Sequence, residues 1–461
     1  MHFPDEFINN TRPFLKEEWE DFTAAFTLAP TTSIRINPGK IIQQDLPFEH
    51  VPWSSYGYYL PERPPFTFDP LFHAGAYYVQ EASSMFIEQV FSQYLTEKDI
   101  KVLDLCAAPG GKSTHIASLI SGDSLLVSNE VIRSRSKILA ENITKAGYPN
   151  VIVTNNDPVD FKKFPAFFDV ILIDAPCSGE GMFRKDSEAV NEWSLSNVRL
   201  CQERQRRIIA DVWDALKPEG LLIYSTCTYN RDENEDNVIW MRNEFDAENL
   251  PIDVKPEWGI NSAYDEDIHA YHFFPHKVKG EGFFLSVLKK KSEDFVRINR
   301  KDSFKKGSRQ KTNTLLKEYL NYIGESEKYQ FFDKSNSWFA FPKKQYEDFL
   351  FIASQSRLVS AGIYIGEMKG KDFVPHHSLA MSSELNTEAF YRFDVDCRTA
   401  ISYLRRDNLF FEDLPKGYIL LTYKDHPLGF IKNIGNRANN LYPNEWRIHS
   451  SHIANDEINI I

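Results

Sequence analysis

Short apolar runs alternate with helix-like stretches over about residues 75–291. The runs lie at 101–105, 124–128, 151–153, 170–173 and 220–224. Runs of this length, joined by helical sequence, are typical of buried parallel strands connected by helices. We therefore predict an α/β fold with a doubly wound, Rossmann-like sheet, whose ligands bind at the carboxyl ends of the strands.

The rest of the chain divides into further units. A chain of 461 residues is too long for one hydrophobic core, because cores stop growing at roughly 250–300 residues. Proline-broken, aromatic-rich sequence predicts a small domain at 1–74, before the sheet domain at 75–291. Cation-rich sequence predicts a basic linker at 292–312, which is either a solvated connector or a seam that touches phosphates.

Two units follow the linker. A helical stretch and short β-like runs predict a compact mixed domain at 313–385. Two β-like segments at 417–423 and 426–432, joined by a tight polar turn, predict a small β-barrel within 386–461.

Composition narrows the class of protein. With 42% apolar and 26% charged residues, no stretch approaches the ~20 apolar residues of a membrane-spanning helix, so we exclude a membrane protein. The first residues lack the features of a secretory signal, so we expect a cytoplasmic protein with reduced cysteines. Its five cysteines form no C-x-x-C pair, and we predict no metal site. The net charge of −12 disfavours nucleic acid as a partner unless basic side chains gather locally.

A small-residue turn follows the first strand of the predicted sheet. It consists of Cys106, Ala107, Ala108, Pro109, Gly110, Gly111 and Lys112, and it leads into an apolar helix. Small residues permit close backbone approach, and the helix offers free amide donors at its N-terminus. We predict that this turn binds a cofactor.

Three cofactors compete for the turn. A nucleotide phosphate loop would match Gly111-Lys112-Ser113, with Asp174 after a Walker-B-like strand, but Cys106 replaces the first glycine that this loop needs. A dinucleotide site would need G-x-G-x-x-G, which is absent from the turn. S-adenosylmethionine requires no wrapped triphosphate, so it is the prediction that we favour.

Two acids support a cofactor at this edge. Glu130 closes the second strand, where such folds place a carboxylate on ribose hydroxyls, and Asp157 follows the third, where it could accept from an adenine amine. Either acid alone is as well explained as a loop or helix cap. Their occurrence at successive strand ends favours cofactor binding.

Two cysteines follow two further strands. Cys177 comes just after Asp174, and Cys227 comes after the strand that begins near residue 220. Cytosine methylation is a reaction that uses a thiol beside a methyl donor. Carbon 5 of cytosine is a poor nucleophile, but addition of a thiolate at carbon 6 makes carbon 5 enamine-like and open to methylation. A second group must then help to remove the carbon-5 proton and expel the sulfur. Asp174 is placed to pair with ring nitrogen 3 and the exocyclic amine, and so to stabilise charge on the ring.

The residues quoted so far resemble the motifs of the Nop/Sun RNA 5-methylcytosine methyltransferases. The likeness lies in 106–112, 174–181 and 225–229, with further signatures at 35–37 and 78–85, and it covers roughly residues 1–291. It implies an RNA-binding N-terminal domain and an S-adenosylmethionine-dependent methyltransferase core. It also implies that Cys227 is the nucleophile, that Cys177 helps release the product, and that Cys106 to Lys112, Glu130, Asp157 and Asp174 contact the cofactor.

The remaining sequence resembles the extension of bacterial RsmF-type 16S rRNA methyltransferases. The likeness lies in 366–367, 375–380, 428–430 and 441–443. It implies a middle domain followed by a PUA-like RNA-binding barrel. We therefore expect small-subunit rRNA as substrate, with tRNA as the close alternative, and a monomeric enzyme. A non-catalytic RNA-binding assembly factor is the alternative from another class.

Cationic and aromatic side chains complete the predicted RNA site. We expect an RNA track along a set of basic residues: Arg35, Arg184, Lys185, Arg204, Arg206 and Arg207. For 204–207 a solvated helix face explains the pattern equally well. Phe183 or Tyr229 could stack on a flipped-out base, although a packed core is the commoner place for such rings.

Overall fold

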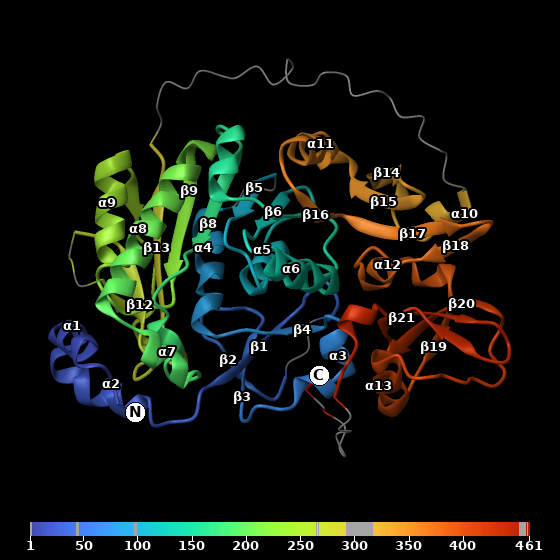
Figure 1. Cartoon of the computed structure of the whole chain (residues 1–461), viewed down its shortest axis with the longest axis horizontal. Coiled ribbons are helices and arrows are strands. Elements are labelled where there is room, and N and C mark those ends of the chain that lie inside the picture. Colours follow the sequence, from blue (N-terminus) through green and yellow to red (C-terminus); the bar gives the residue numbers. More distant parts are fainter. Residues whose placement is uncertain are drawn as a thin grey trace.

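The computed structural model describes residues 2–42, 46–95, 99–263, 265, 267–291, 317–450, 458, 460 and 461. The predicted basic linker at 292–312 lies outside the described residues. None of the helices in the described ranges has the length and apolarity that would carry it across a lipid bilayer. The chain runs from the central sheet to two further sheets that lie on one side of it (Figure 1).

Five parallel strands form the middle of the central sheet, as predicted. They are β5 (Lys101–Asp104), β6 (Leu125–Asn129), β7 (Val151–Thr154), β8 (Phe168–Asp174) and β9 (Leu216–Thr226). The order in space is β7-β6-β5-β8-β9. The chain leaves β5 toward β6 and later continues on the other side with β8, so the point where the winding reverses lies between β5 and β8. Ligands bind at such a point in open α/β sheets.

Antiparallel strands extend this sheet at both edges, which the sequence pattern did not predict. Beyond β9 lie β13 (Phe283–Lys289), β12 (Ala270–Phe273) and β11 (Asn261–Ser262), and β10 (Glu248–Leu250) also pairs with β13. At the opposite edge, β16 (Leu358–Ala361) pairs antiparallel with β7. The sheet is therefore mixed, and the segment after the linker is part of it.

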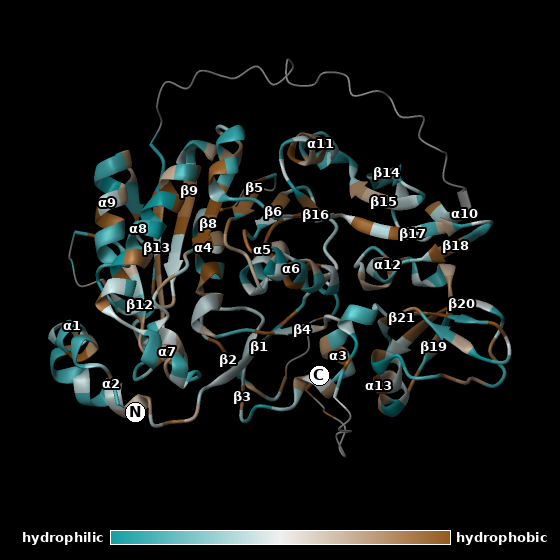
Figure 2. Ribbon diagram, viewed as in Figure 1, coloured by the Kyte–Doolittle hydropathy of each residue, from teal (hydrophilic) through white to brown (hydrophobic). Residues whose placement is uncertain are grey.

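Helices cover both faces of the sheet. One face packs on α4 (Ile87–Tyr94), α5 (Gly111–Leu119) and α6 (Arg133–Ala146), and the other on α8 (Leu195–Val212) and α9 (Glu235–Phe245). Successive residues of β5, such as Val102 and Leu103, belong to opposite cores. A strand buried on both faces must be apolar at every position, which explains the continuous apolar runs of the sequence (Figure 2).

The N-terminal part contributes helices and a small sheet. Helices α1 (Asp5–Leu15) and α2 (Trp19–Ala25) pack on the loops after β8 and β9, together with α7 (Ser187–Glu192). The sheet has the order β2-β3-β1-β4, with β2 (Glu49–His50), β3 (Gly57–Leu60), β1 (Thr32–Ile36) and β4 (Tyr77–Val79), and α3 (Pro70–His73) precedes β4.

Two four-stranded sheets form the C-terminal part. The first has β14 (Tyr329–Lys334), β15 (Ser337–Pro342), β17 (Ile363–Lys369) and β18 (Asp372–Pro375), with α10 (Lys317–Leu320), α11 (Tyr346–Gln355) and α12 (His377–Met381). The second has β19 (Tyr391–Asp394), β20 (Gly417–Tyr423), β21 (His426–Asn433) and β22 (Ala438–Asn440), with α13 (Cys397–Arg405). The predicted pair at 417–423 and 426–432 is confirmed. Within the described residues these strands form an open sheet rather than a closed barrel.

The C-terminal sheet packs back onto the N-terminal part. One hydrophobic core joins Leu71 of α3 to Leu404 of α13 and Ile419 of β20. The C-terminal sheet and α13 therefore lie beside α3 and the small N-terminal sheet (Figure 1).

Candidate active site at the carboxyl edge of the sheet

A cavity of ≈ 210 Å³ opens at the carboxyl ends of β5 and β8. Strand β4 of the N-terminal part forms one wall, and the small-residue turn after β5 forms another. The lining residues are Tyr78, Val79, Gln80, Glu81, Ser84, Asp104, Cys106, Ala107, Ala108, Pro109, Gly111, Lys112 and Asp174. The cavity therefore lies where the winding of the sheet reverses, as the sequence predicted for a cofactor.

The turn owes its shape to glycine. Gly110 has a φ of 118°, which favours glycine, and α5 begins directly after it. A side chain at Gly111 would meet the Tyr78 ring at 3.3 Å. The first amides of α5 have no partners within the helix, so they can donate to an anionic group of a ligand.

An ion pair joins Lys112, at the start of α5, to Asp174, at the end of β8. Lys112 Nζ lies 2.8 Å from Asp174 Oδ2, and Ser225 Oγ donates to Asp174 Oδ1 at 2.8 Å. Burial alone would lower the pKa of Lys112, but attraction to Asp174 and the hydrogen bond hold it above its ordinary value. Asp174 is thereby oriented by Lys112 from the start of α5 and by Ser225 from β9.

Asp104 is a further acid of this cavity, to which the sequence reasoning assigned no role. It is fully buried, and Ser113 Oγ donates to its Oδ2 at 2.6 Å, while Oδ1 has no hydrogen-bond partner. Burial, followed by the charge of Asp174, raises the pKa of Asp104 to about 7. Its signal in the sequence is an acid at the end of an apolar strand, immediately before the turn.

The cavity suits the amino-acid part of S-adenosylmethionine. An unpartnered buried carboxylate oxygen on Asp104 can accept from an ammonium group, and the free amides of α5 can donate to a carboxylate. Burial raises the pKa of the Cys106 thiol, so it stays uncharged beside these groups. The donor set thus matches a zwitterionic ligand.

Glu130 and Asp157 do not line this cavity. Glu130 is 3% exposed; its Oε1 accepts from the amide of Ile132 at 2.8 Å, and its Oε2 lies 3.5 Å from Arg135. Asp157 caps a short 3-10 helix by accepting from the amide of Val159 at 3.1 Å. Both acids follow strands as expected, and both already serve as local caps.

The two predicted cysteines are brought together. Cys177 Sγ and Cys227 Sγ lie 3.2 Å apart, and the amide of Cys227 donates to Cys177 Sγ at 3.4 Å. Both side chains are half-buried. The hydrogen bond to Cys227, followed by burial, raises the pKa of Cys177 well above its ordinary value. The cavity and the cysteines lie at the same edge of the sheet, because Asp174, which lines the cavity, comes three residues before Cys177.

The prediction that Arg35 and Arg184 belong to an RNA track is wrong, because both side chains are buried. The Arg35 side chain is buried; it donates to Gln80 Oε1 at 2.9 Å and to Thr114 Oγ1 at 2.7 Å. Arg184 is 5% exposed and pairs with Glu281 at 2.7 Å. Both arginines therefore stabilise packing between elements. The sequence could not predict this burial, because the partners of Arg35 and Arg184 lie far from them along the chain.

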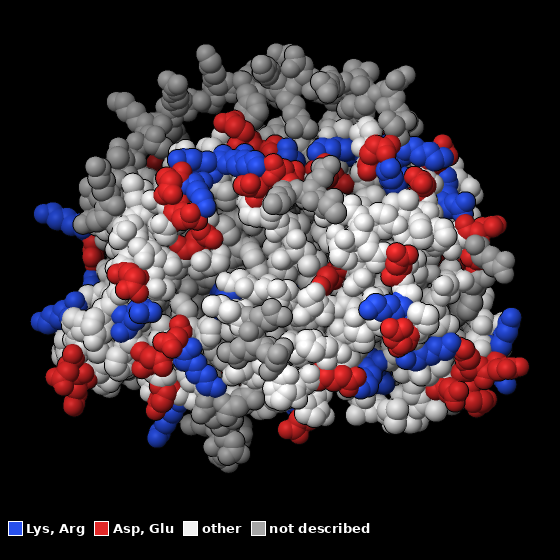
Figure 3. All heavy atoms as spheres, turned by 180° about the vertical axis from the view of Figure 1, so that it is seen from behind, with Lys and Arg blue, Asp and Glu red and all other residues white. Residues whose placement is uncertain are grey.

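The remaining track residues and the two rings can also be placed. Lys185, Arg204 and Arg207 are exposed, whereas Arg206 donates to Asn237 Oδ1 at 2.9 Å. Phe183 and Tyr229 lie in one aromatic core with Phe22, so neither ring is free to stack on a base. On the face seen in Figure 3, Lys and Arg lie among Asp and Glu. In the described part of the chain no three His, Cys, Asp or Glu side chains are grouped as a metal site.

The fold and this site define an S-adenosylmethionine-dependent methyltransferase. Three family models match the chain: the 16S rRNA methyltransferase RsmB/F at 93–289, the N-terminal domain of 16S rRNA methyltransferase RsmF at 3–82, and the methyltransferase RsmF PUA domain at 390–448. The chain belongs to the RsmF group of this family.

Two relatives are similar to this chain over nearly its whole length. Ribosomal RNA small subunit methyltransferase F of Enterobacter sp. (strain 638) is 31% identical over 476 residues, covering 96% of both proteins. The protein of the same name in Escherichia coli O6:H1 is 31% identical over 477 residues, with 96% of both covered.

Solved structures support the fold. A methyltransferase homolog protein from Pyrococcus horikoshii is 27% identical, with a TM-score of 0.55, over 62% of this chain and 95% of that chain. NSun6 from Pyrococcus horikoshii with SFG has a TM-score of 0.54 at 21% identity, over 63% and 99% of the two chains.

Proposed function

We propose that this chain methylates carbon 5 of a cytosine in RNA, with S-adenosylmethionine as donor and 16S rRNA as substrate. The observation that carries the proposal is the 3.2 Å separation of the Cys177 and Cys227 sulfurs beside a cavity that suits the cofactor. The names of the relatives and the PUA family model support rRNA over tRNA. Two apposed thiols support an enzyme over a non-catalytic assembly factor.

Each site residue has a role in the proposed reaction. Cys227, as thiolate, attacks carbon 6 of the base, and carbon 5 becomes nucleophilic. Nitrogen 3 of the ring gains a proton from solvent as the thiolate adds, and Asp174, held by Lys112 and Ser225, accepts hydrogen bonds from this N–H and from the exocyclic amine, which stabilises the charged ring. Bound S-adenosylmethionine supplies an electrophilic methyl group. We assign its binding to Cys106, Ala107, Ala108, Pro109, Gly110, Gly111, Lys112, Glu130, Asp157 and Asp174, and we add Asp104.

Cys177 acts at the release step. Its raised pKa keeps it a neutral thiol, so its S–H can donate to the Cys227 sulfur. Once a base or a water beside Cys177 has taken the carbon-5 proton, the electron pair of that C–H bond re-forms the double bond between carbons 5 and 6, the carbon–sulfur bond breaks, and Cys177 stabilises the departing thiolate. The proposed reaction thus uses one thiol as nucleophile and its neighbour as hydrogen-bond donor.

The predicted domains fit this function. We propose RNA-binding domains at 1–74 and 386–461 around a methyltransferase domain at 75–291, a linker at 292–312 and a middle domain at 313–385. A monomer in the cytoplasm, where ribosomal subunits assemble, stays our prediction. Sedimentation of the purified protein tests the monomer.

Methyl transfer from labelled S-adenosylmethionine tests the function. The substrates are naked 16S rRNA, isolated small subunits that lack the modification, and tRNA, and the product nucleoside is identified by mass spectrometry. We expect 5-methylcytosine in 16S rRNA, free or within the subunit. Label in tRNA alone would favour the alternative substrate, and RNA binding without transfer to any substrate would favour the assembly factor.

A further inference from the structure

The loops that carry Cys177 and Cys227 also hold two buried carboxylates that are not paired with a cation within the described residues. Glu180 and Glu233 are both 0% exposed. Within the described ranges neither forms an ion pair with Lys, Arg or His, and the arginines near them in the chain are paired elsewhere, Arg184 with Glu281 and Arg231 with Asp265. Burial of an unpaired carboxylate is costly unless several hydrogen bonds compensate. The donors that compensate here come from the loops that carry the two cysteines.

The hydrogen bonds of Glu180 tie its own loop to the other cysteine loop. Glu180 follows Cys177 in the chain, and its Oε2 accepts from the amides of Tyr229 and Asn230 at 2.6 and 3.0 Å, just after Cys227. Trp193 Nε1 donates to Oε1 at 2.9 Å. Removal of this carboxylate would leave two backbone amides buried without acceptors.

Glu233 makes the reciprocal contact. It follows Cys227, and its Oε2 accepts from the amide of Ser178, directly after Cys177, at 3.0 Å. Gln205 Nε2 from α8 donates to the same oxygen at 2.7 Å. Each loop therefore sends a carboxylate to the backbone of the other. The amide that Glu233 binds directly follows Cys177, and the amides that Glu180 binds lie two and three residues after Cys227.

Asn230 bridges the two acids. Its Nδ2 lies 2.9 Å from Glu180 Oε1 and 2.9 Å from Glu233 Oε1. Thr228 Oγ1 at 2.9 Å and Ser178 Oγ at 3.2 Å are also within reach of Nδ2. A primary amide has two N–H groups, and carboxylate oxygens are the stronger acceptors, so it can satisfy one oxygen of each acid. Its Oδ1 accepts from the amide of Glu233 at 2.9 Å, which fixes the orientation of the side chain. No acidic side chain of similar size could replace it, because three carboxylates would then face one another.

We infer that Glu180, Asn230 and Glu233 form a carboxylate clasp that positions the Cys177 and Cys227 thiols to act on the same cytosine. They are positioning residues, because their contacts are to the backbone of the two loops rather than to sulfur. The inference rests on the proposed function for its catalytic consequence. Burial raises the pKa of Glu233 to about 7 despite the hydrogen bonds it accepts, which is the cost of holding two acids at this place.

A thiol-pairing experiment tests the positioning without RNA. Diamide oxidises two thiols to a disulfide and is itself reduced to the hydrazine, so the rate of Cys177–Cys227 pairing reports how often the sulfurs meet. Peptide mass spectrometry identifies the pair. We expect Asn230→Ala and Glu180→Gln to slow this pairing several-fold. Asp69→Asn is the matched control, because it alters a buried capping carboxylate of α3, remote from the cysteines.

Kinetics supply the catalytic readout. Loosened thiols should lower kcat by roughly 100-fold, the cost of a displacement of about 1 Å at a reacting centre. KM for RNA and Kd for S-adenosylmethionine should stay close to the natural values. Asn230→Ala and Glu180→Gln serve as independent variants, so that one failure to fold leaves the other as a test.

The outcomes separate the clasp from the proposed reaction. Unchanged pairing rates in folded variants would overturn the clasp, as would a loss of melting temperature with no change in pairing. If the natural protein methylates no RNA while the variants still slow pairing, the clasp stands and the proposed function fails.

Discussion

Cys177 and Cys227 are fifty residues apart in the chain, yet their sulfurs lie 3.2 Å from each other. Strands β8 and β9 are parallel neighbours, with Asp174 opposite Ser225. Cys177 and Cys227 follow these two residues at nearly the same distance, so the register of the strands brings the thiols together. The register between β8 and β9 thus determines which two thiols lie close together in the site.

Loss of Cys177 should trap the reaction at its covalent stage. In Cys177→Ala the departing Cys227 sulfur loses its hydrogen-bond donor, so release slows more than attack. We expect a protein–RNA adduct that survives denaturing electrophoresis and needs S-adenosylmethionine to form efficiently. Cys201→Ala, a change at the buried cysteine of α8, is the control. Normal turnover without an adduct in Cys177→Ala would refute the release role.

Asp174→Asn should lower kcat by roughly 100-fold, the usual cost of removing one group that stabilises transition-state charge. The substitution breaks the ion pair with Lys112 and leaves that cation buried without its partner. Single-turnover methyl transfer at saturating S-adenosylmethionine measures the effect. A kcat equal to that of the natural protein would show that Asp174 acts on cofactor binding alone.

The acidity of Asp104 should be visible in the stability of the cofactor-free protein. Burial raises its pKa from 3.8 to about 7, so the folded state holds this proton more tightly than the unfolded state does. The contribution of protonated Asp104 to the free energy of unfolding is fully present below about pH 4 and is lost as the pH rises through about 7. Asp104→Asn stays neutral and should flatten the melting temperature over this range. Parallel pH profiles for the two proteins would contradict the assignment.

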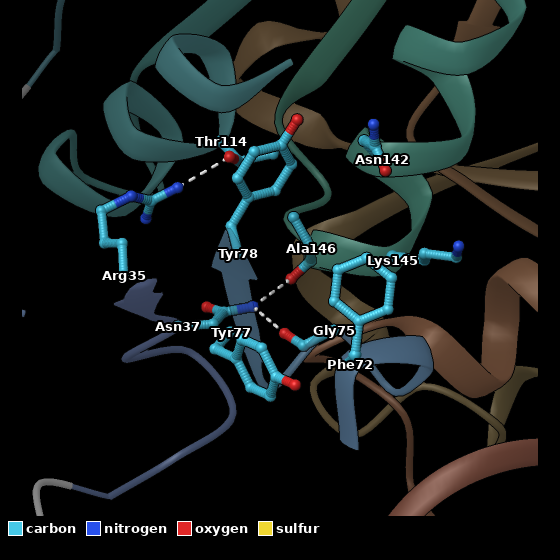
Figure 4. Close-up of a pocket in the computed structure, with 10 residues that line it drawn as sticks. All are labelled: Arg35, Asn37, Phe72, Gly75, Tyr77, Tyr78, Thr114, Asn142, Lys145 and Ala146. Carbon is cyan, nitrogen blue, oxygen red and sulfur yellow. Dashed lines mark hydrogen bonds between the residues drawn. The ribbon is translucent and has the colours of Figure 1, made fainter. Parts of the chain in front are cut away.

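Arg35 should support cofactor affinity from a distance. Its guanidinium donates to Thr114 of α5 (Figure 4) and to Gln80 of the N-terminal part. Burial lowers its pKa only to about 10, so it stays charged at neutral pH. Arg35→Met should cost about 1–3 kcal/mol of stability, because buried acceptors lose their donors, and should weaken S-adenosylmethionine binding. Calorimetry checks both effects. The exposed Arg398→Met is the control, and equal affinities in both variants would refute the coupling.

Local sequence was sufficient to predict the strands, the turn and the two cysteines. Apolar runs at 101–105 and 170–173 predict buried strands because both faces of the sheet are covered, and Brändén's rule then places the groups that follow them at one edge. Cys177 and Cys227 were predicted at this common edge, although their contact depends on the strand register.

Long-range contacts account for what the sequence did not reveal. Strand β16 joins β7 across some two hundred residues of chain, and no local pattern encodes such a partner. Arg35 and Arg184 look like surface cations until their buried acceptors are known. Glu180 lies within a recognised motif, but its role depends on amides that come from the next strand's loop.

The proposed reaction requires a covalent bond between Cys227 and the base. RNA that carries 5-fluorocytosine would trap this bond, because the adduct has no carbon-5 proton to lose after methylation and cannot expel the sulfur. After digestion with protease and nuclease, mass spectrometry locates the nucleotide. We expect a methylated fluorocytosine on the peptide that contains Cys227. A nucleotide on the Cys177 peptide, or no adduct despite methyl transfer to normal RNA, would show that Cys227 is not the nucleophile.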